Sequence, residues 1–265
     1  MGYKLGFIGC GNMGGALITA AAKTVAGQEI AVCDYDKAKA ENFAKKFGAN
    51  ALSGREIAEK ADFIVLGVKP QVMGDTIAEF ADALCARENV TVVTMAAGVS
   101  IAAIRGYIGK DVPVIRIMPN TPVALGAGMI LYAAEDVDEE TENTFLQAFA
   151  KAGLFDKIPE EKIDAGSALS GCGPAFVYAF AEALADGGVE CGVPREKAAI
   201  YTAQTLLGAA QMLLEYGHPA DLKDAVCSPG GTTIAGIHAL EDAGFRGAAM
   251  SAVTAAYKRT LELKK

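Results

Sequence analysis

The stretch KLGFIGCGNMGGAL, residues 4–17, decides the fold. Its first part, Lys4–Ile8, is an apolar run typical of a short buried strand, and a helical pattern follows it. Between the two lie Gly9, Gly11 and Gly14, in the spacing G-x-G-x-x-G. This order of strand, glycine-rich turn and helix predicts the dinucleotide-binding turn of an α/β protein.

Each glycine of the turn has its own predicted task. Gly9 allows the tight turn, Gly11 lets the backbone approach a pyrophosphate, and Gly14 lets the helix pack closely on the strand. The helix begins near Asn12 and Met13, and its N-terminus attracts phosphates. We predict that these five residues contact a dinucleotide. The alternative is a glycine-rich turn that serves packing alone.

An acidic residue stands where such folds recognise the ribose. Asp34 follows the predicted strand Ile30–Cys33, and its carboxylate can accept the ribose hydroxyls. A 2′-phosphate beside Asp34 and Asp36 would be repelled, although Lys37 and other nearby lysines offset part of this repulsion. Both NAD and NADP, in the reduced form, are therefore candidate cofactors, and the sequence favours NADH.

Two different domains are predicted. Strands and helices alternate up to about residue 158, and the strands are continuous Val/Ile runs, which predicts a parallel sheet covered on both faces. A capping-box pattern, Ser53 and Glu56, opens one helix, and Gly48 ends the helix that starts at Asp36. Beyond Pro159 the pattern is helical throughout. We expect an α/β Rossmann-like dinucleotide-binding domain over residues 1–159 and an all-α domain over residues 160–265.

Three further loops follow predicted strands: GVKPQ (67–71), MAAG (95–98) and MPNTP (118–122). In an open α/β sheet, ligands bind outside the carboxyl ends of the strands, so these loops should surround the cofactor. The lysine of the first loop can donate to a phosphate or ribose, or it is an ordinary surface lysine. The alanines of the second leave room for a nicotinamide ring. The predicted cofactor contacts from the three loops are Val68, Lys69, Pro70, Ala96, Ala97, Gly98 and Asn120.

Composition excludes several other classes. The formal net charge of −8 and the pI of about 4.9 argue against a nucleic-acid partner, which would require many lysines and arginines. The six cysteines lack CxxC spacing and there are only two histidines, so we expect no metal site and reduced thiols in the cytoplasm. The start of the chain has a strand pattern, not that of a signal peptide. The longest uncharged runs, residues 89–104 and 165–181, are too short to span a bilayer.

Two helical segments are apolar on nearly every face. They are KAAIYTAQTLLGAAQMLLEYG, residues 197–217, and RGAAMSAVTAAYKRTLEL, residues 246–263. A helix that is apolar all round has to be buried on all sides, which a thin helical domain cannot achieve alone. We therefore expect these helices to pack against a second copy of the chain in a homo-oligomer.

The motifs FIGCGNMGGAL, VKPQ, MPNTP, ALSGCGPAFVYAFAEALADGGVECGV and DAVCSPGGTT occur in that order. Together they closely resemble the pyrroline-5-carboxylate reductase family over essentially the whole chain. The resemblance implies a Rossmann-like domain followed by a helical dimerisation domain, in interlocked dimers that often assemble into decamers. The implied reaction is hydride transfer from NAD(P)H to 1-pyrroline-5-carboxylate, giving L-proline.

The SPGGTT motif supplies groups for a small anionic imine. Gly230 and Gly231 expose backbone amides, Thr232 and Thr233 begin a helix whose N-terminus favours an anion, and Ser228 adds a hydroxyl. We predict that these five residues bind the substrate. The resemblance assigns Thr233 to hydrogen-bonding the substrate nitrogen, which makes it the candidate catalytic residue. The alternative is a helix stop and turn with a hydroxyl cap.

The sequence departs from the family pattern at several places. Asp34 and Asp36 replace small or hydroxyl residues, which leaves the coenzyme preference open. Gly54 stands where an asparagine is often found, and Cys172 replaces the middle serine of Ser-Gly-Ser-Gly-Pro. None of these changes removes a group that the chemistry requires.

Two other functions compete with this one. The β-hydroxyacid dehydrogenases share the glycine-rich start but use a catalytic lysine on a helix after a Gly-x-x-Gly element. No lysine follows at Pro174–Tyr178 here, so alcohol oxidation lacks its base. A non-catalytic nucleotide-binding protein would have no need of the anion pocket that SPGGTT predicts.

Overall fold

The computed structural model describes residues 2–263. Its internal contacts divide the chain into two compact units. The first runs up to Cys172 and also takes in the chain from Ala256 onward, and the second is Gly173–Ala255. The chain therefore passes between the units at two places, and the two units are described separately below.

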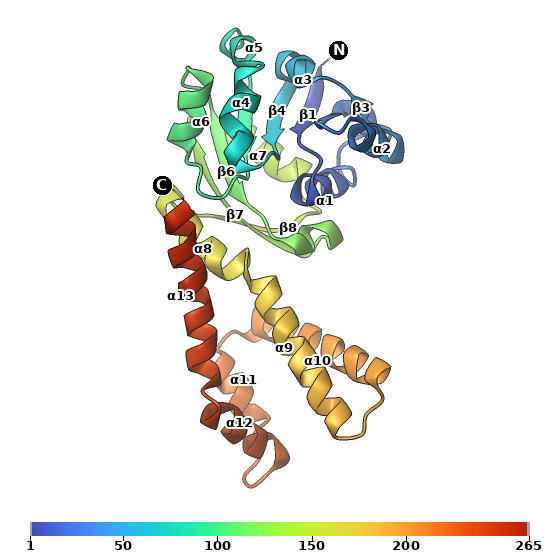
Figure 1. Cartoon of the computed structure of the whole chain (residues 1–265), viewed down its shortest axis with the longest axis vertical. Helices are drawn as coiled ribbons and strands as arrows, with labels where there is room; N and C mark the ends of the chain where they lie inside the picture. The colour runs from blue at the N-terminus through green and yellow to red at the C-terminus, as the bar shows by residue number, and fades with distance from the viewer. Residues whose placement is uncertain (1, 264–265) are drawn as a thin grey trace. The chain divides into compact units, whose positions relative to one another are not determined.

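The first unit is built on an eight-stranded sheet with the strand order β3-β2-β1-β4-β5-β6-β7-β8 (Figure 1). Strands β1 to β6 are parallel to one another, as the sequence predicts. The strands are β1 (Tyr3–Ile8), β2 (Ile30–Cys33), β3 (Asn50–Ala51), β4 (Ala61–Leu66), β5 (Thr91–Thr94), β6 (Val114–Met118), β7 (Gly128–Glu135) and β8 (Gly153–Lys157).

Strand β7 departs from the predicted parallel arrangement. It runs antiparallel to β6, and β8 is parallel to β7. Parallel neighbours need a crossover long enough to return to the start of the sheet, usually a helix. Only the 3₁₀ turn η3 (Thr121–Leu125) and a few further residues separate β6 from β7, so the chain can only turn back.

Helices cover both faces of this sheet, as the sequence predicts. One buried core lies under α3, α4, α5 and α6, and the other lies under α1, α2 and α7. The helices of the first unit are α1 (Asn12–Ala21), α2 (Lys37–Phe47), α3 (Gly54–Lys60), α4 (Met73–Ala78), α5 (Ala81–Cys85), α6 (Ile101–Ile108), α7 (Glu139–Ala148) and α8 (Glu160–Ser170), with the 3₁₀ turns η1 (Gly27–Glu29) and η2 (Pro70–Val72).

The predicted helix boundaries are confirmed where local capping sets them. Ser53 and Glu56 form a complete capping box at the start of α3. Asp36 caps α2, which ends at Gly48 with φ of 66°, a conformation that favours glycine. Helix α1 begins at Asn12, as predicted, and ends at Ala21.

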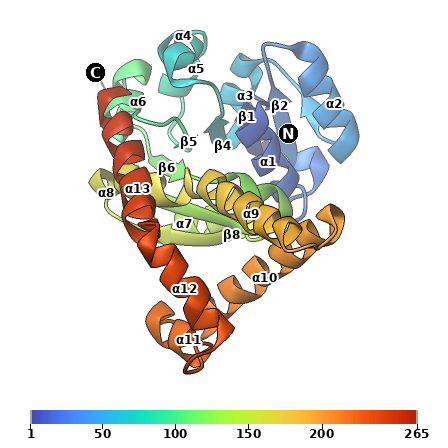
Figure 2. The ribbon, with the colours of Figure 1, turned by 60° about the horizontal axis from the view of Figure 1, so that its bottom comes forward.

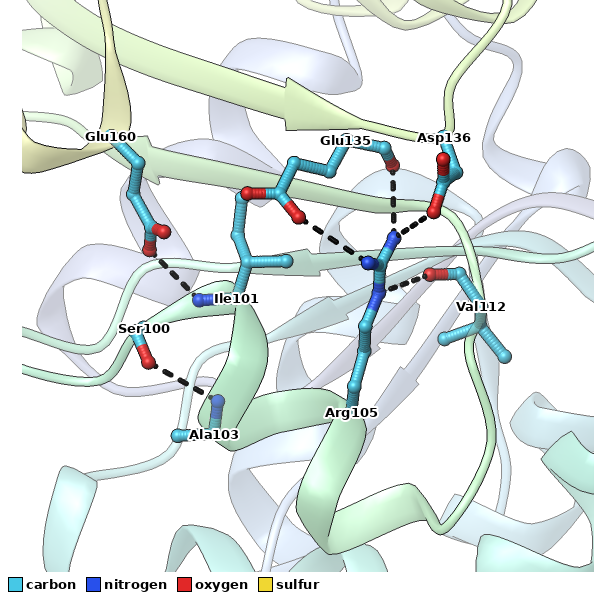
Figure 3. Close-up of polar contacts among 8 residues, drawn as sticks. All are labelled: Ser100, Ile101, Ala103, Arg105, Val112, Glu135, Asp136 and Glu160. Carbon is cyan, nitrogen blue, oxygen red and sulfur yellow. Dashed lines mark hydrogen bonds and ion pairs between the residues drawn. The ribbon is translucent and has the colours of Figure 1, made fainter.

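A buried charge cluster fixes α8 to the sheet. Arg116 on β6 is 2% exposed; its Nη2 lies 2.6 Å from Asp164 Oδ1 and its Nη1 3.1 Å from Glu160 Oε1. The same Glu160 oxygen accepts the backbone N–H of Ile101 at 2.8 Å (Figure 3). Buried charges are stable when paired in this way. As a consequence, α8 belongs to the first unit, whereas the predicted domain boundary falls just before it, between residues 159 and 160.

A second polar cluster lies at the edge of the sheet where the parallel strand β6 begins. Arg105 on α6 donates from Nε to the Val112 carbonyl at 3.0 Å and from Nη2 to Asp136 Oδ2 at 2.6 Å, and it also pairs with Glu135 (Figure 3). Glu135 pairs in register with Val114, the first residue of β6. Ligands bind at the carboxyl ends of such strands, so this cluster serves stability.

The second unit consists of helices: α9 (Gly173–Glu190), α10 (Arg195–Tyr216), α11 (Pro219–Ala225), α12 (Thr232–Asp242) and α13 (Phe245–Leu263), whose last turns belong to the first unit. Helices α9 and α10 pack side by side (Figures 1 and 2). Among its described residues, only Ala185 and Ala198 are buried, while Tyr178, Ile200 and Leu214 are 62%, 65% and 83% exposed. A single chain therefore leaves these helices with large uncovered apolar surfaces.

One stretch bears on the expectation that the uncharged runs are too short to span a bilayer. Residues Glu160–Glu190, covering α8 and α9, are long and apolar enough by length and composition, and only 11% of their most apolar window is buried. The stretch is longer than the uncharged run 165–181 because it includes charged residues near both ends, and it contains the Gly-Pro pair Gly173–Pro174. In the structure, helix resumes at Gly173 after a short turn.

Candidate functional site

The glycine-rich loop connects β1 to α1 through very close backbone contacts. Gly9 has φ of 106°, and a Cβ placed on it would lie 2.6 Å from the carbonyl carbon of Gly67, at the end of β4. A Cβ on Gly67 would in turn lie 2.6 Å from the Gly9 oxygen. The loops after β1 and β4 therefore meet backbone to backbone. Gly67 lies in the GVKPQ motif, but its contact with Gly9 cannot be read from the sequence, because it joins residues far apart in the chain.

Gly11 and Gly14 differ in what surrounds them. A Cβ on Gly14 would lie 2.1 Å from the Gly9 oxygen, so this glycine is required for packing of the helix on the loop. A Cβ on Gly11 would meet no atom within 4 Å, and Gly11 is the N-cap of α1, with no side-chain cap. Open space at a helix N-terminus suits a bound phosphate. Packing alone explains Gly14 but not Gly11.

Asp34 is attached to the same loop. Its Oδ2 accepts the N–H of Cys10 at 2.6 Å, and its Oδ1 accepts the N–H of Asp36 at 2.9 Å. Burial, reinforced by the charge of Asp34, raises the pKa of the Cys10 thiol to about 12. Cys10 is therefore a protonated, unreactive thiol. Asp36 is occupied in capping α2, where its Oδ1 accepts the N–H of Ala38.

Most of the other predicted cofactor residues lie at the same sheet edge. Strands β1, β4 and β5 are neighbours, so the loops that follow them adjoin the glycine-rich loop. Lys69 is exposed at the start of η2, between Val68 and Pro70. Ala96 is buried, and Ala97 is exposed next to Gly98. The structure thus brings the candidate residues of the first three loops to one edge, with small side chains at the end of β5.

Asn120 is different, because its side chain is used within the protein. It is 8% exposed; its Nδ2 donates to the carbonyl of Ser170 at 3.0 Å, and its Oδ1 accepts the N–H of Met129 at 3.0 Å. These bonds join the loop after β6 to the start of β7 and to the end of α8. They use one of the two N–H groups and one of the two oxygen lone pairs of the amide, so its side chain is anchored within the protein whatever else it contacts.

The SPGGTT residues form a turn of the second unit. Gly230 has φ of 67°, and the N–H of Gly231 donates to the Ser228 carbonyl at 3.0 Å. Thr232 and Thr233 are the first two residues of α12, as predicted, and both are exposed. Gly231 is the N-cap of α12, with no side-chain cap. The alternative of a hydroxyl-capped helix start is therefore wrong, and the amides of the first turn are left for other acceptors.

The order of strands, the glycine-rich loop at the N-terminus of α1 and the acidic residue after β2 define the class of the protein as a Rossmann-type NAD(P)-dependent oxidoreductase. Residues 4–98 match the family model described as NADP oxidoreductase, coenzyme F420-dependent. Residues 160–263 match a second model, described as pyrroline-5-carboxylate reductase dimerisation.

Comparisons over the full length give the family. A pyrroline-5-carboxylate reductase of Glycine max is 40% identical, with 98% of this chain and 96% of that protein covered. The structure of a pyrroline-5-carboxylate reductase from Coxiella burnetii superposes with a TM-score of 0.91 at 34% identity, covering 100% of both chains. The Plasmodium falciparum enzyme, with NADP bound, gives a TM-score of 0.88 at 30% identity, covering 99% of this chain and 98% of that one. The chain belongs to the pyrroline-5-carboxylate reductase family.

The contrast between Gly11 and Gly14 can be tested by substitution. We expect Gly11→Ala to fold with an unchanged melting temperature, because its Cβ has free space, and to bind NADH at least roughly tenfold more weakly, because the methyl occupies the phosphate position. Gly14→Ala should lower the melting temperature, since its Cβ would collide with backbone. Thermal unfolding and NADH fluorescence titration measure the two effects. An unchanged NADH affinity of Gly11→Ala would contradict the assignment.

Proposed function

We propose that this chain is a cytoplasmic enzyme that reduces 1-pyrroline-5-carboxylate to L-proline with NADH or NADPH. The full-length similarity to enzymes of that name carries the proposal. The open space at Gly11 and the uncapped start of α12 support it, since each suits one of the two anionic reactants. The reduced nicotinamide would supply the hydride.

The first unit would hold the cofactor. The N-terminus of α1 at Asn12 and Met13, together with the Gly11 backbone, would bind the pyrophosphate. Asp34, already fixed by the Cys10 amide, would accept the ribose hydroxyls on its remaining lone pairs. Val68, Lys69, Pro70, Ala96, Ala97 and Gly98 would border the cofactor towards the nicotinamide end.

The second unit, in a domain that we place at residues 160–265, would hold the substrate. The amides of Gly230 and Thr232 would bind the carboxylate at the positive end of α12, with the Ser228 hydroxyl as a further donor. The expected Gly231 amide donor is instead used within the turn, where it bonds to the Ser228 carbonyl, so Gly231 would contribute the open space of a residue without a side chain. The Thr233 hydroxyl would hydrogen-bond the ring nitrogen and hold it while the neighbouring carbon receives hydride. A proton would reach the nitrogen by way of water. Orientation of this kind supplies much of the rate in such a reaction.

The reductase assay tests the activity and the role of Thr233 together. The wild-type chain should consume NADH or NADPH when 1-pyrroline-5-carboxylate is added, with proline as product. Thr233→Ala should lower kcat about a hundredfold, as expected for loss of a positioned proton-relay group, with an unchanged melting temperature. Thr233→Ser, which keeps the hydroxyl, is the matched control. Absence of reductase activity in the wild-type chain would refute the proposed function. Full activity of Thr233→Ala would refute only the proposed role of Thr233.

We further propose a preference for NADH, because the carboxylate of Asp34 lies where a 2′-phosphate would be placed. The expected result is a kcat/KM for NADH roughly tenfold above that for NADPH, a difference of about 1.4 kcal/mol. Asp34→Asn, which keeps an oxygen for the Cys10 amide and loses the charge, should narrow the ratio. Steady-state kinetics with both coenzymes measure it. A wild-type preference of more than tenfold for NADPH would reverse the assignment.

We propose that residues 160–265 form a homodimer, and that dimers assemble further into a decamer. The match of this region to a dimerisation model and the exposure of Tyr178, Ile200 and Leu214 support the proposal. The apolar stretch Glu160–Glu190 would then be covered by a partner chain instead of lipid, which agrees with a cytoplasmic location.

Light scattering tests the assembly. At micromolar concentration we expect the mass of a dimer or a multiple of it, and Leu214→Glu should reduce this mass because a charge would enter an apolar interface. Leu125→Glu is the matched control, since Leu125 is 86% exposed on the first unit. A monomeric wild-type chain would overturn the proposal.

A further inference from the structure

We infer that Asn120 is a positioning residue, which acts on the reaction through the end of α8. This inference rests on the proposed reductase function. It replaces the expectation from sequence that Asn120 contacts the cofactor. The observations that carry it are the two hydrogen bonds of a nearly buried side chain and the place of their partners in the chain.

The side-chain amide of Asn120 acts as a bridge. Its carbonyl oxygen holds the N–H of Met129, which belongs to β7, and its NH₂ group holds the carbonyl of Ser170, the last residue of α8. The carbonyls of the last helical turn have no partner within their helix, so an external donor is needed here. An asparagine can satisfy a donor and an acceptor at once, which a carboxylate cannot do.

Strand β6 and the loop after it hold both ends of α8. Arg116 within β6 pairs with Glu160 and Asp164 in the first turns of the helix, and Asn120, just beyond β6, binds Ser170 at its end. These contacts at both ends restrain rotation and sliding of the helix relative to the sheet.

The residues after α8 transmit this position along the chain. Gly171 follows directly, and a Cβ on it would lie 2.8 Å from both the carbonyl and the hydroxyl oxygen of Ser167, so the turn packs against α8. Helix α9 begins at Gly173, and everything that carries the SPGGTT turn follows from there. The hydrogen bond from Asn120 to Ser170 therefore anchors the end of α8, directly before the segment that leads to the proposed substrate turn.

Asn120 lies apart from the groups that hold the cofactor phosphates. The strand order places β4 and β5 between β1, which precedes the glycine-rich loop, and β6. Loss of the bond to Ser170 should therefore disturb the reaction with substrate and leave the affinity for NADH unchanged. Misplacement of reacting groups by about 1 Å can reduce a rate roughly a hundredfold, so a single lost bond can have a large effect.

The test uses Asn120→Asp in the full-length protein. The variant keeps an oxygen for the Met129 amide and replaces the donor to Ser170 with a second acceptor. We expect kcat/KM for 1-pyrroline-5-carboxylate to fall roughly tenfold or more, with the Kd for NADH within about twofold of wild type. Hydrogen exchange should increase at the end of α8 and at residues 171–173. Asn120→Ser, which is smaller and uncharged, should show the same pattern if the aspartate variant fails to fold, and Leu125→Ala is the control in the same loop.

The outcomes separate the possible roles. An NADH affinity that falls in parallel with kcat/KM would make Asn120 a cofactor contact and overturn the inference. Wild-type kcat/KM in both variants would overturn it as well. Hydrogen exchange does not depend on turnover, so unchanged exchange at residues 171–173 in the variants would refute the anchoring by Asn120 whether or not the protein is active. A wild-type chain without reductase activity would refute the proposed function and would leave the anchoring untouched.

Discussion

The buried guanidinium of Arg116 requires negatively charged partners close to it inside the protein. A charge inside a sheet is stable only when partners of opposite charge come to it, and here both partners are supplied by one helix, through Glu160 and Asp164. This requirement brings α8 onto the sheet and places Glu160 at the start of α6. It thereby makes α8 part of the first unit, directly before the point at which the chain enters the second unit.

The two proposed anion-binding positions, one for the cofactor and one for the substrate, begin in the same way. In each, a glycine precedes a helix whose first amides have no side-chain cap: Gly11 at α1 and Gly231 at α12. Other helices of the chain, such as α2, α3 and α6, begin with a capping Asp or Ser. An uncapped start alone does not mark a ligand, because α4, α5, α8, α10 and α11 also begin without a side-chain cap. The two proposed anion positions have in addition a glycine N-cap, which places no side chain over the first amides.

The features that the sequence predicts well are those determined by residues that are neighbours in the chain. The glycine-rich turn, the capping box of Ser53 and Glu56 and the stop at Gly48 depend on a few adjacent residues, and all are found. The direction of β7, the placement of α8 and the partners of Asn120 depend on contacts between residues far apart in the chain. Asn120 is a clear example, because its motif suggested a ligand contact and its bonds to Met129 and Ser170 appear only once the chain is folded.

The uncapped start of α12 has a consequence for the folded protein without ligand. A glycine N-cap makes a helix less stable than a Ser or Asp cap by only a few tenths of a kcal/mol, and in α12 this small deficit lies at the proposed substrate turn. A carboxylate that binds there takes the place of the missing cap. In the proposed site, the substrate would complete the secondary structure of the enzyme, and its departure as product would return the first turn of α12 to a less ordered state.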